Sequence, residues 1–413
     1  MSSNGTKTGI SRGVGRISSS IAIGWRASSV TGWGVYSLNL TLELIRQERN
    51  PVWISPPHLL DVDSAARVSL DPVLKRQNHL AGLLEKTGIL EFDFPALHSL
   101  RNDFLPSLDD QIIRGSKNIG VIFFENTDFS AEGMERARKY DLIVTGSTWN
   151  KERLETCGLP HVVNVFQGVD KKMFRAKRDT SRYPGRFVVF SGGKLEYRKA
   201  QDVVIAAFRE FQKTHKDALL LCAWANQWPG IIPTIARSPH VSGAPNFLED
   251  RSLDLTKWLL ANGLPEESFI DLGMPPNREI PSYLAASDTA VFPNRCEPGT
   301  NLVAMEAMAT GLPIIISANT GHLDLIEDGN SFVLCRQTRV IPYEPYTGVE
   351  GWAEPDVDEV IDHLTTIYED RQTATERGVA AANTIERFSW DRQIAELIFN
   401  IDRPGCEISK TRI

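Results

Sequence analysis

Short apolar runs alternate with amphipathic segments most clearly from residue 186 onward. Runs rich in Val, Ile, Leu and Phe predict strands at residues 187–191, 219–223, 269–272, 289–293, 313–317 and 332–335. Between the first two, Val203, Val204, Ala207, Phe208 and Phe211 recur at helical spacing, with charged residues on the opposite face. Buried parallel strands joined by crossover helices produce this alternation. The pattern therefore predicts an α/β fold with a doubly wound parallel sheet.

The N-terminal half shows the same pattern less regularly. It predicts a helix at residues 34–47 and strands at 20–24, 52–55, 120–124, 142–145 and 162–166. Residues 170–185 are charged and end in Tyr183-Pro184-Gly185, as expected of a linker. Further helices are predicted at 356–369, 374–386 and 389–401. We expect a flexible tail at 1–18, Rossmann-like domains at 19–172 and 186–388 with a linker at 173–185, and a final segment at 389–413.

The amino-acid composition excludes several kinds of function for this protein. A length of 413 residues with 42% hydrophobic and 23% charged residues suits two globular domains. The net charge of −7 argues against sequence-independent binding of nucleic acid, which requires a broad basic surface. Five cysteines without a CxxC pair favour a reducing, cytoplasmic setting. The longest apolar run, 218–225, is too short to cross a bilayer, so any membrane contact would be peripheral.

The most informative stretch is 295–313. Every residue from Leu302 to Ala309 is apolar except Glu306, which predicts an enclosed helix carrying one carboxylate. A buried carboxylate costs several kcal/mol unless it is hydrogen-bonded or paired, so Glu306 is either a ligand-binding group or the partner of backbone groups or an arginine.

The turn before this helix has the features of an anion site. Gly299, Thr300, Asn301 and Leu302 lead from a buried strand into the helix, so free backbone N–H groups should face the cleft. Glu306 could accept hydrogen bonds from vicinal hydroxyl groups, and Glu297 on the preceding loop could hold another hydroxylated ring. The arrangement suits a sugar attached to a phosphate.

Two further segments carry candidate phosphate contacts. In 191–202, Gly193 permits close approach of a ligand, and Lys194 and Lys199 could neutralise a diphosphate; a solvated basic loop is the alternative. In 24–36, Gly32 and Gly34 form a glycine-rich turn that by itself is equally typical of a structural turn.

Together these motifs resemble the retaining glycosyltransferases of the GT-B fold, family 4 type, whose signature is two glutamates flanking a glycine-containing helix start. The resemblance implies that Glu297 contacts the transferred sugar, that Glu306 contacts the nucleotide ribose, and that Lys194 and Lys199 bind the donor pyrophosphate. The two glutamates are nine positions apart, one more than usual, so the loop at 298–301 has one extra residue. Lys194 stands where the family has an arginine; Arg198 could compensate for that change, but we expect it to point to solvent.

The resemblance extends along the chain through residues 141–144, 167–170 and 388–391. It implies that the loop with Gly32 and Gly34 closes over the donor phosphate and that the final helix packs back on the N-terminal domain. Glu125 and the neighbouring Asn126 would lie near the acceptor, unless Glu125 is a satisfied loop acid. His322 could touch the sugar, unless it is an ordinary surface histidine.

The implied activity is retaining transfer of a sugar from a nucleoside-diphosphate sugar to an unidentified glycan, lipid, peptide or small-molecule acceptor. No cofactor is expected. The sequence has no His/Cys ligand set, and we expect the lysines to replace a metal ion. The alternatives are an epimerase or phosphorylase of the same fold, or an inactive sugar-nucleotide-binding subunit. The oligomeric state, donor base, sugar and linkage stay open.

Overall fold

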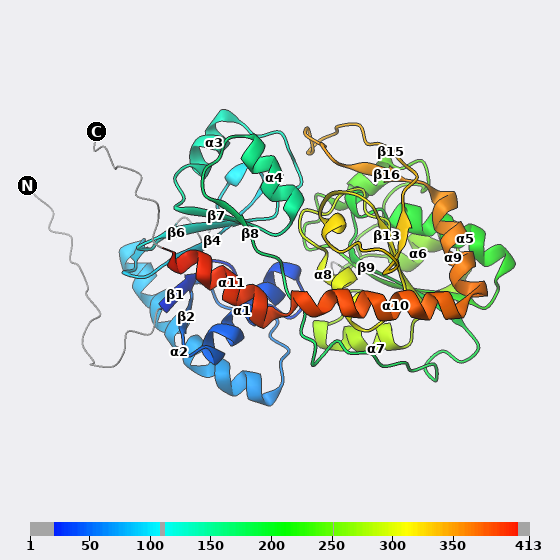
Figure 1. The fold of residues 1–413 in the computed structure, drawn as a ribbon, viewed down its shortest axis with the longest axis horizontal. Helices are drawn as coiled ribbons and strands as arrows, with labels where there is room; N and C mark the ends of the chain where they lie inside the picture. Colours follow the sequence, from blue (N-terminus) through cyan, green and yellow to red (C-terminus); the bar gives the residue numbers. More distant parts are fainter. Residues whose placement is uncertain (1–19, 108–111, 251, 404–413) are drawn as a thin grey trace, which may run out of the picture.

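The computed structural model describes residues 20–107, 112–250 and 252–403, and it contains two parallel six-stranded sheets, one in each half of the chain (Figure 1). The N-terminal sheet has the order β2-β1-β4-β6-β7-β8, and the C-terminal sheet has the order β11-β10-β9-β12-β13-β14. We call the two halves the N-terminal lobe and the C-terminal lobe. The predicted pair of doubly wound sheets is confirmed, whereas the tail expected at 1–18 and residues 404–413 lie outside the described residues.

The strands of the N-terminal sheet are β1 (Ser20–Ile23), β2 (Asn50–Trp53), β4 (Ala96–Leu100), β6 (Asn118–Ile122), β7 (Leu142–Thr145) and β8 (Val162–Asn164). Those of the C-terminal sheet are β9 (Phe187–Lys194), β10 (Ala218–Ala225), β11 (Phe269–Asp271), β12 (Thr289–Phe292), β13 (Ile314–Ser317) and β14 (Phe332–Leu334). Two small ladders pair β3 (Leu90–Glu91) with β5 (Ile113–Arg114) and β15 (Gln337–Arg339) with β16 (Ala353–Pro355).

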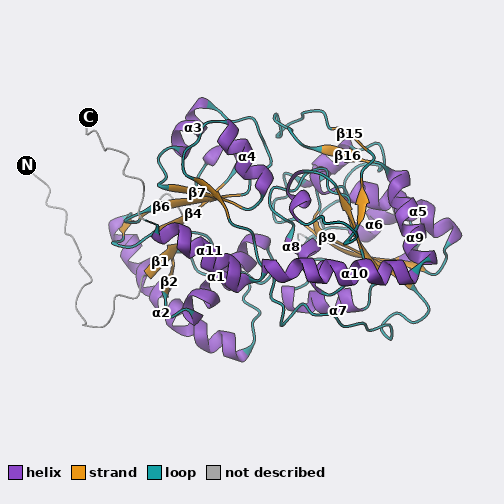
Figure 2. Cartoon of the chain, in the orientation of Figure 1, coloured by secondary structure: helices purple, strands orange, loops and turns teal. Residues whose placement is uncertain are grey.

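Helices cover both sheets, as the cartoon in Figure 2 shows. In the N-terminal half they are α1 (Gly32–Arg46), α2 (Ser64–Thr87), α3 (Ala131–Ala137) and α4 (Thr148–Thr156). In the C-terminal half they are α5 (Gln201–Thr214), α6 (Leu255–Ala261), α7 (Ile280–Ala285), α8 (Leu302–Ala309), α9 (Val357–Glu369), α10 (Arg371–Ile385) and α11 (Trp390–Asp402). No helix within the described ranges has both the length and the apolar character that a membrane crossing requires.

Strand β4 and helix α2 are among the elements of the N-terminal lobe that the sequence pattern did not predict. All five residues of β4 are buried, but His98 and Ser99 interrupt its apolar run, so it did not stand out as a strand. The 24-residue helix α2 buries few side chains, among them Leu70, Val73 and Leu80, and its remaining surface is polar. Both elements depend on contacts with neighbouring elements. Neither has the regular pattern of apolar residues by which a strand or helix is predicted from sequence.

The last helix returns to the N-terminal lobe. In Figure 1, α11 lies across α1, and the rings of Trp390 and Tyr36 stack with centroids 5.5 Å apart. The backbone of Val169 pairs with that of Ser389 in an isolated parallel bridge at the start of this helix. At its other end, Lys117 donates to the carbonyl oxygen of Ile401 at 2.7 Å. The C-terminal helix is thereby part of the N-terminal core.

The junction at Gly168 gives a test of this packing. A Cβ atom at Gly168 would lie 2.6 Å from the Cα atom of Trp390, a backbone atom that cannot rotate away. We expect Gly168→Ala to destabilise the protein by about 1 to 3 kcal/mol, as overpacking commonly does, and to lower the melting temperature. The control is Gly82→Ala on α2, where a Cβ meets nothing within 4 Å and alanine should be neutral or stabilising. Equal melting temperatures for the two variants would contradict a tight junction.

Candidate active site

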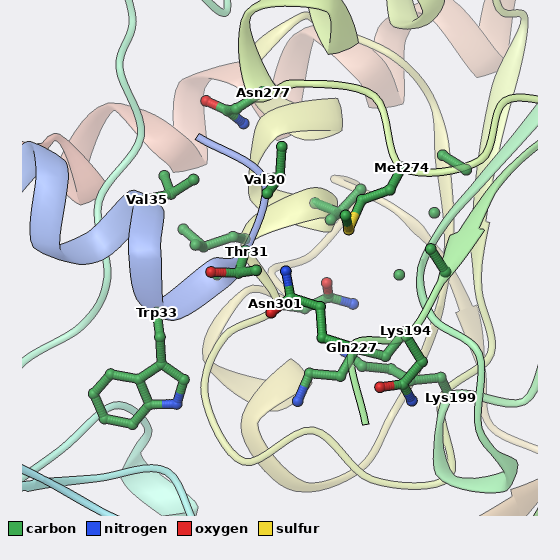
Figure 3. Close-up of a pocket in the computed structure, with 18 of the residues that line it drawn as sticks. Val30, Thr31, Trp33, Val35, Lys194, Lys199, Gln227, Met274, Asn277 and Asn301 are labelled. Atoms are coloured by element: carbon green, nitrogen blue, oxygen red, sulfur yellow. The ribbon is translucent and has the colours of Figure 1, made fainter. Parts of the chain in front are cut away.

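A cleft of about 250 Å³ lies between the lobes and is lined by both. The N-terminal lobe contributes the loop before α1 and the side chains of Phe123, Glu125 and Gln167. The C-terminal lobe contributes the ends of β9 and β10, the segment 273–280 and the first turn of α8. In Figure 3, Thr31 and Trp33 lie on one side of the cleft, and Lys194 and Lys199 lie on the other. Ligands of doubly wound sheets bind at this place, outside the carboxyl ends of the strands.

The first turn of α8 is open toward the cleft. Asn301 precedes the helix with φ of 64° and makes no side-chain capping bond, so the first backbone N–H groups stay uncapped by that side chain. Asn301, Leu302 and Val303 all line the cleft. An uncapped helix N-terminus combines exposed donors with the positive end of the helix dipole, which favours an anion such as a diphosphate.

The loop at 298–301 packs closely against the 3₁₀ turn Thr320–Asp324. A Cβ atom at Gly321 would lie 1.8 Å from the carbonyl oxygen of Gly299, so only glycine fits there. The backbone N–H of Gly321 also donates to the carbonyl oxygen of Glu297 at 2.9 Å. The left-handed conformation of Asn301 then turns the chain into α8.

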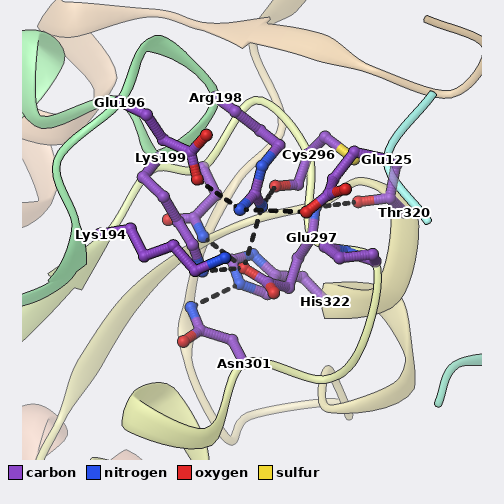
Figure 4. Close-up of polar contacts among 12 residues, drawn as sticks. Glu125, Lys194, Glu196, Arg198, Lys199, Cys296, Glu297, Asn301, Thr320 and His322 are labelled. Carbon is purple, nitrogen blue, oxygen red and sulfur yellow. Dashed lines mark hydrogen bonds and ion pairs between the residues drawn. The ribbon is translucent and has the colours of Figure 1, made fainter. Parts of the chain in front are cut away.

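Glu297 is buried within a set of cationic and amide donors (Figure 4). Lys199 forms an ion pair with its Oε2 atom, Asn294 donates to the same oxygen at 2.8 Å, and the guanidinium of Arg198 lies 3.7 Å away. Burial by itself would raise the pKa of Glu297, but the two cations outweigh it and lower the pKa to about 2. Glu297 is therefore a carboxylate across the physiological range.

Arg198, which we expected at the surface, is buried with only 1% of its area exposed. Its guanidinium pairs with Glu196 at 2.6 Å and lies 3.6 Å from Glu125, which belongs to the other lobe. It also donates to the carbonyl oxygen of Cys296 at 2.9 Å. The expectation was wrong because the carboxylates that stabilise this cation come from three separate segments of the chain, which no local pattern reveals.

Glu306 is also buried, but it has no cationic partner among the described residues. Its Oε1 atom accepts one hydrogen bond from Asn277 Nδ2 at 2.6 Å, and the side chain lines the cleft. Burial raises the pKa of Glu306 to about 8, and the bond from Asn277 only partly opposes this shift. The alternative of an arginine partner within the described ranges is therefore excluded, and the carboxyl is available to a ligand.

The two lysines differ in their surroundings. Lys199 is largely buried: burial lowers its pKa, while the Glu297 carboxylate acts in the opposite sense. Lys194, at the end of β9, has its ammonium 4.5 Å from the centre of the Trp228 ring, a cation–π contact at the cleft wall. Gly193, beside Lys194, lines the same wall with φ of 139°.

Four of the residues that we singled out do not line the cleft. A Cβ atom at Gly34 would lie 2.3 Å from the Cβ of Ser28, so packing explains this glycine. Thr300 is buried behind the loop, with its hydroxyl 2.9 Å from the sulfur of Met305. His322 is fully buried rather than at the surface, its Nε2 atom lies 3.1 Å from Asn301 Nδ2, and burial lowers its pKa to about 4. His322 thus supports Asn301 from behind.

The fourth residue, Asn126, holds a segment that we call the strap, residues 340–352. Asn126 Oδ1 accepts a hydrogen bond from the backbone of Gly348 at 2.7 Å, and Trp352 Nε1 donates to the carbonyl oxygen of Glu125 at 3.0 Å. On the other side of the cleft, the N–H of Asn277 donates to the carbonyl oxygen of Ser29 at 2.8 Å. The lobes therefore touch on two sides of the cleft, and the residues that line the cleft lie between these two contacts.

Several lining residues escaped the sequence analysis, notably Trp33, Phe123, Gln167, Trp228 and Asn277. Trp33 lies next to the glycines that we selected, and Gln167 opens the segment 167–170 that we noted as a landmark. Asn277 has no local signal, because only the fold brings it to Glu306. Amide and aromatic residues are common in loops, so their type alone does not mark a site.

The fold and cleft are those of the GT-B class. The structure resembles that of sucrose-phosphate synthase from Thermosynechococcus elongatus, with a TM-score of 0.62, 15% identity and coverage of 92% of this chain and 98% of that one. It also resembles HepE from Anabaena in complex with UDP-glucose, with a TM-score of 0.63, 16% identity and coverage of 92% and 99%. Both likenesses concern the fold.

Residues 172–343 match the model of the family "Glycosyl transferases group 1". Over this region the chain is similar to that family, in agreement with the resemblance of its motifs. A D-inositol 3-phosphate glycosyltransferase of Corynebacterium aurimucosum is 26% identical over 251 residues, 58% of this chain and 50% of that protein. A glycogen synthase of Mycobacterium tuberculosis is 27% identical over 198 residues, 47% of this chain and 41% of that protein. The chain thus spans about half the length of these curated relatives or less.

The raised pKa of Glu306 gives a pH-dependent prediction. Between about pH 4.5 and 8 the folded protein keeps a proton that the unfolded chain releases, so wild-type stability falls as pH rises through this window. The amide in the Glu306→Gln variant cannot ionise. The free energy of unfolding of this variant, relative to that of the wild type, should therefore rise with pH and should have risen by about 1 to 3 kcal/mol at pH 7. The measurement is denaturant unfolding from pH 5 to 8.

The control is Glu369→Gln at the exposed end of α9, which should follow the wild type at every pH. A difference between Glu306→Gln and wild type that stays constant over the whole range would show that burial does not perturb this carboxyl.

Proposed function

We propose that the protein is a retaining glycosyltransferase that moves a hexose from a nucleoside-diphosphate sugar to an acceptor hydroxyl, without a metal ion. The observation that carries this proposal is the convergence of three kinds of group on one closed cleft: the uncapped turn of α8, the lysines at 194 and 199, and the two glutamates at 297 and 306. The match of residues 172–343 to the family model and the GT-B fold support it, and so does the UDP-glucose named for HepE.

Each group has a role in this proposal. The diphosphate lies at the first turn of α8 beside Lys194 and Lys199, where preorganised positive charge stabilises the charge that develops on the leaving group. Glu306 accepts hydrogen bonds from the two ribose hydroxyls, which explains a buried carboxyl with one protein donor. Glu297 faces the transferred sugar and is held in place by Lys199, Asn294 and Arg198.

We also propose that the lobes correspond to domains at 19–172 and 186–388, with 173–185 as the linker. The contacts of the linker support its role. Arg178 pairs with Asp288 at 2.9 Å, and the N–H of Asp179 donates to the carbonyl oxygen of Ala285 at 2.7 Å, so this segment lies on the C-terminal lobe near α7. Opening of the cleft would then pivot at its N-terminal end, where α10 also passes into α11.

One purified sample tests the function. A panel of UDP-, GDP- and ADP-hexoses is incubated with mixed acceptors, and sugar transfer, nucleotide release without acceptor and nucleotide binding are measured. Transfer with retained anomeric configuration, seen by NMR of the product, is the expected result. Nucleotide binding without turnover would instead indicate a binding subunit, and an altered free sugar nucleotide or a sugar phosphate would indicate an epimerase or phosphorylase.

Activity should persist in excess EDTA; complete loss restored by magnesium or manganese would refute metal independence.

Lys199→Ala should lower turnover at least about tenfold, because one cation on a developing diphosphate charge contributes that much or more. The variant also leaves Glu297 with Arg198 and Asn294 alone, so we expect a lower melting temperature as well. The control Lys213→Ala removes an exposed lysine of the same lobe that pairs only with Glu210, and it should change neither quantity. Unaltered kinetics in Lys199→Ala would remove this lysine from the site.

A further inference from the structure

We propose that the acceptor is an uncharged hydroxylated ring, such as a neutral sugar, rather than a phosphorylated one, and that Trp33, Gln167 and Glu125 recognise it. The proposal rests on the glycosyltransferase function proposed above and specifies its acceptor class. Its basis is the chemistry of the lining residues that come from the N-terminal lobe.

Charge separates the two walls. All the lysines and arginines among the described lining residues, namely Lys194, Arg198 and Lys199, belong to the C-terminal lobe. The N-terminal lobe contributes only one charged lining residue, Glu125, and that charge is negative. A phosphate monoester carries about −1.5 to −2 charges at neutral pH and would meet a carboxylate there. The N-terminal wall therefore repels a phosphorylated acceptor. The cations of the C-terminal wall cannot compensate, because they pair with the donor diphosphate and with Glu297.

An aromatic platform lies on the same wall. Trp33 is half-buried at the start of α1, and its ring is braced by Trp25, with centroids 5.3 Å apart and planes at 72°, and by Phe123, at 4.9 Å and 75°. Figure 3 shows Trp33 below the first turn of α1, on the N-terminal side of the cleft. A fixed aromatic ring offers a large apolar surface with a preferred orientation, which suits the C–H face of a pyranose ring.

Gln167 supplies the complementary polar group. The side chain lines the cleft with 8% of its area exposed, and its amide makes no hydrogen bond with the residues that the structure describes. Its Oε1 atom lies beside the loop before α8, 3.5 Å from where a Cβ of residue 299 would be. A nearly buried amide can form up to four hydrogen bonds, and buried polar groups almost always have partners. A ligand with several hydroxyl groups would provide them.

Glu125 completes the wall. Its carboxylate is anchored 3.6 Å from the Arg198 guanidinium, next to the ion pair of Glu297, so it lies close to the place where the sugar is transferred. An aliphatic lipid chain on this wall would leave the amide and this carboxylate unsatisfied. A neutral ring with hydroxyl groups on its edge and C–H groups on its face satisfies the aromatic, amide and carboxylate groups together.

The experiment separates this proposal from the function on which it rests. Binding of UDP to the full-length protein is measured first by calorimetry. With UDP saturating, binding of methyl glucoside, methyl mannoside, glucose 6-phosphate, inositol 3-phosphate and octanol is then compared by saturation-transfer NMR. We expect at least one neutral glycoside to bind, and the phosphorylated compounds to bind at least about tenfold more weakly or not at all.

Two variants locate the site. Trp33→Leu and Gln167→Leu should each weaken binding of the neutral glycoside at least about tenfold and leave UDP affinity within about twofold. The matched control is Trp228→Leu, which removes a partly exposed tryptophan from the opposite wall and should change UDP affinity more than glycoside binding. Preferred binding of a phosphorylated compound or of octanol, no glycoside binding despite UDP binding, or unchanged glycoside binding in both N-terminal variants would overturn the acceptor proposal. Failure of the wild type to bind any nucleotide would instead overturn the proposed function.

Discussion

The buried carboxylate of Glu297 constrains the centre of the cleft, because a buried charge has to be matched by opposite charge and hydrogen bonds at close range. Its partners arrive from two places: Lys199 and Arg198 from the segment after β9, and Asn294 from the segment after β12. These two strands are neighbours in the sheet, so their carboxyl ends bring the groups together. The geometry of the sheet thus determines the chemistry of the cleft.

The same cluster joins the two lobes. Arg198 has more negative than positive charge around it, and one of its carboxylates, Glu125, belongs to the N-terminal lobe. Separating the lobes would move that carboxylate away and change the field at Glu297. The strap and the contact between Asn277 and Ser29 hold the closed arrangement from both sides. Closure of the cleft and the electrostatic state of its centre are therefore parts of one equilibrium.

The sequence predicted much of this architecture, but not all. The C-terminal strands are continuous apolar runs, so their number and order along the chain were readable, and Glu306 stood out as the single acid in an apolar helix. Strand β4 was not readable because His98 and Ser99 are buried only by the fold. Arg198 was misplaced for a related reason: two of its three carboxylate partners, Glu125 and Glu297, lie in other segments. Periodicity reports which face of an element is buried, and it says nothing about which distant charges meet there.

The return of α11 to the first lobe has a consequence for biosynthesis. Residues 390–402 are made after both sheets, yet Trp390 and Leu397 belong to the same apolar core as Tyr36 and Leu40 of α1. While the ribosome is still adding the second half, the first lobe has an uncovered apolar surface, and it can complete its core only when the last helix emerges. Domains usually fold in order as they are synthesised. Here the lobe that is translated first must be the last to finish folding.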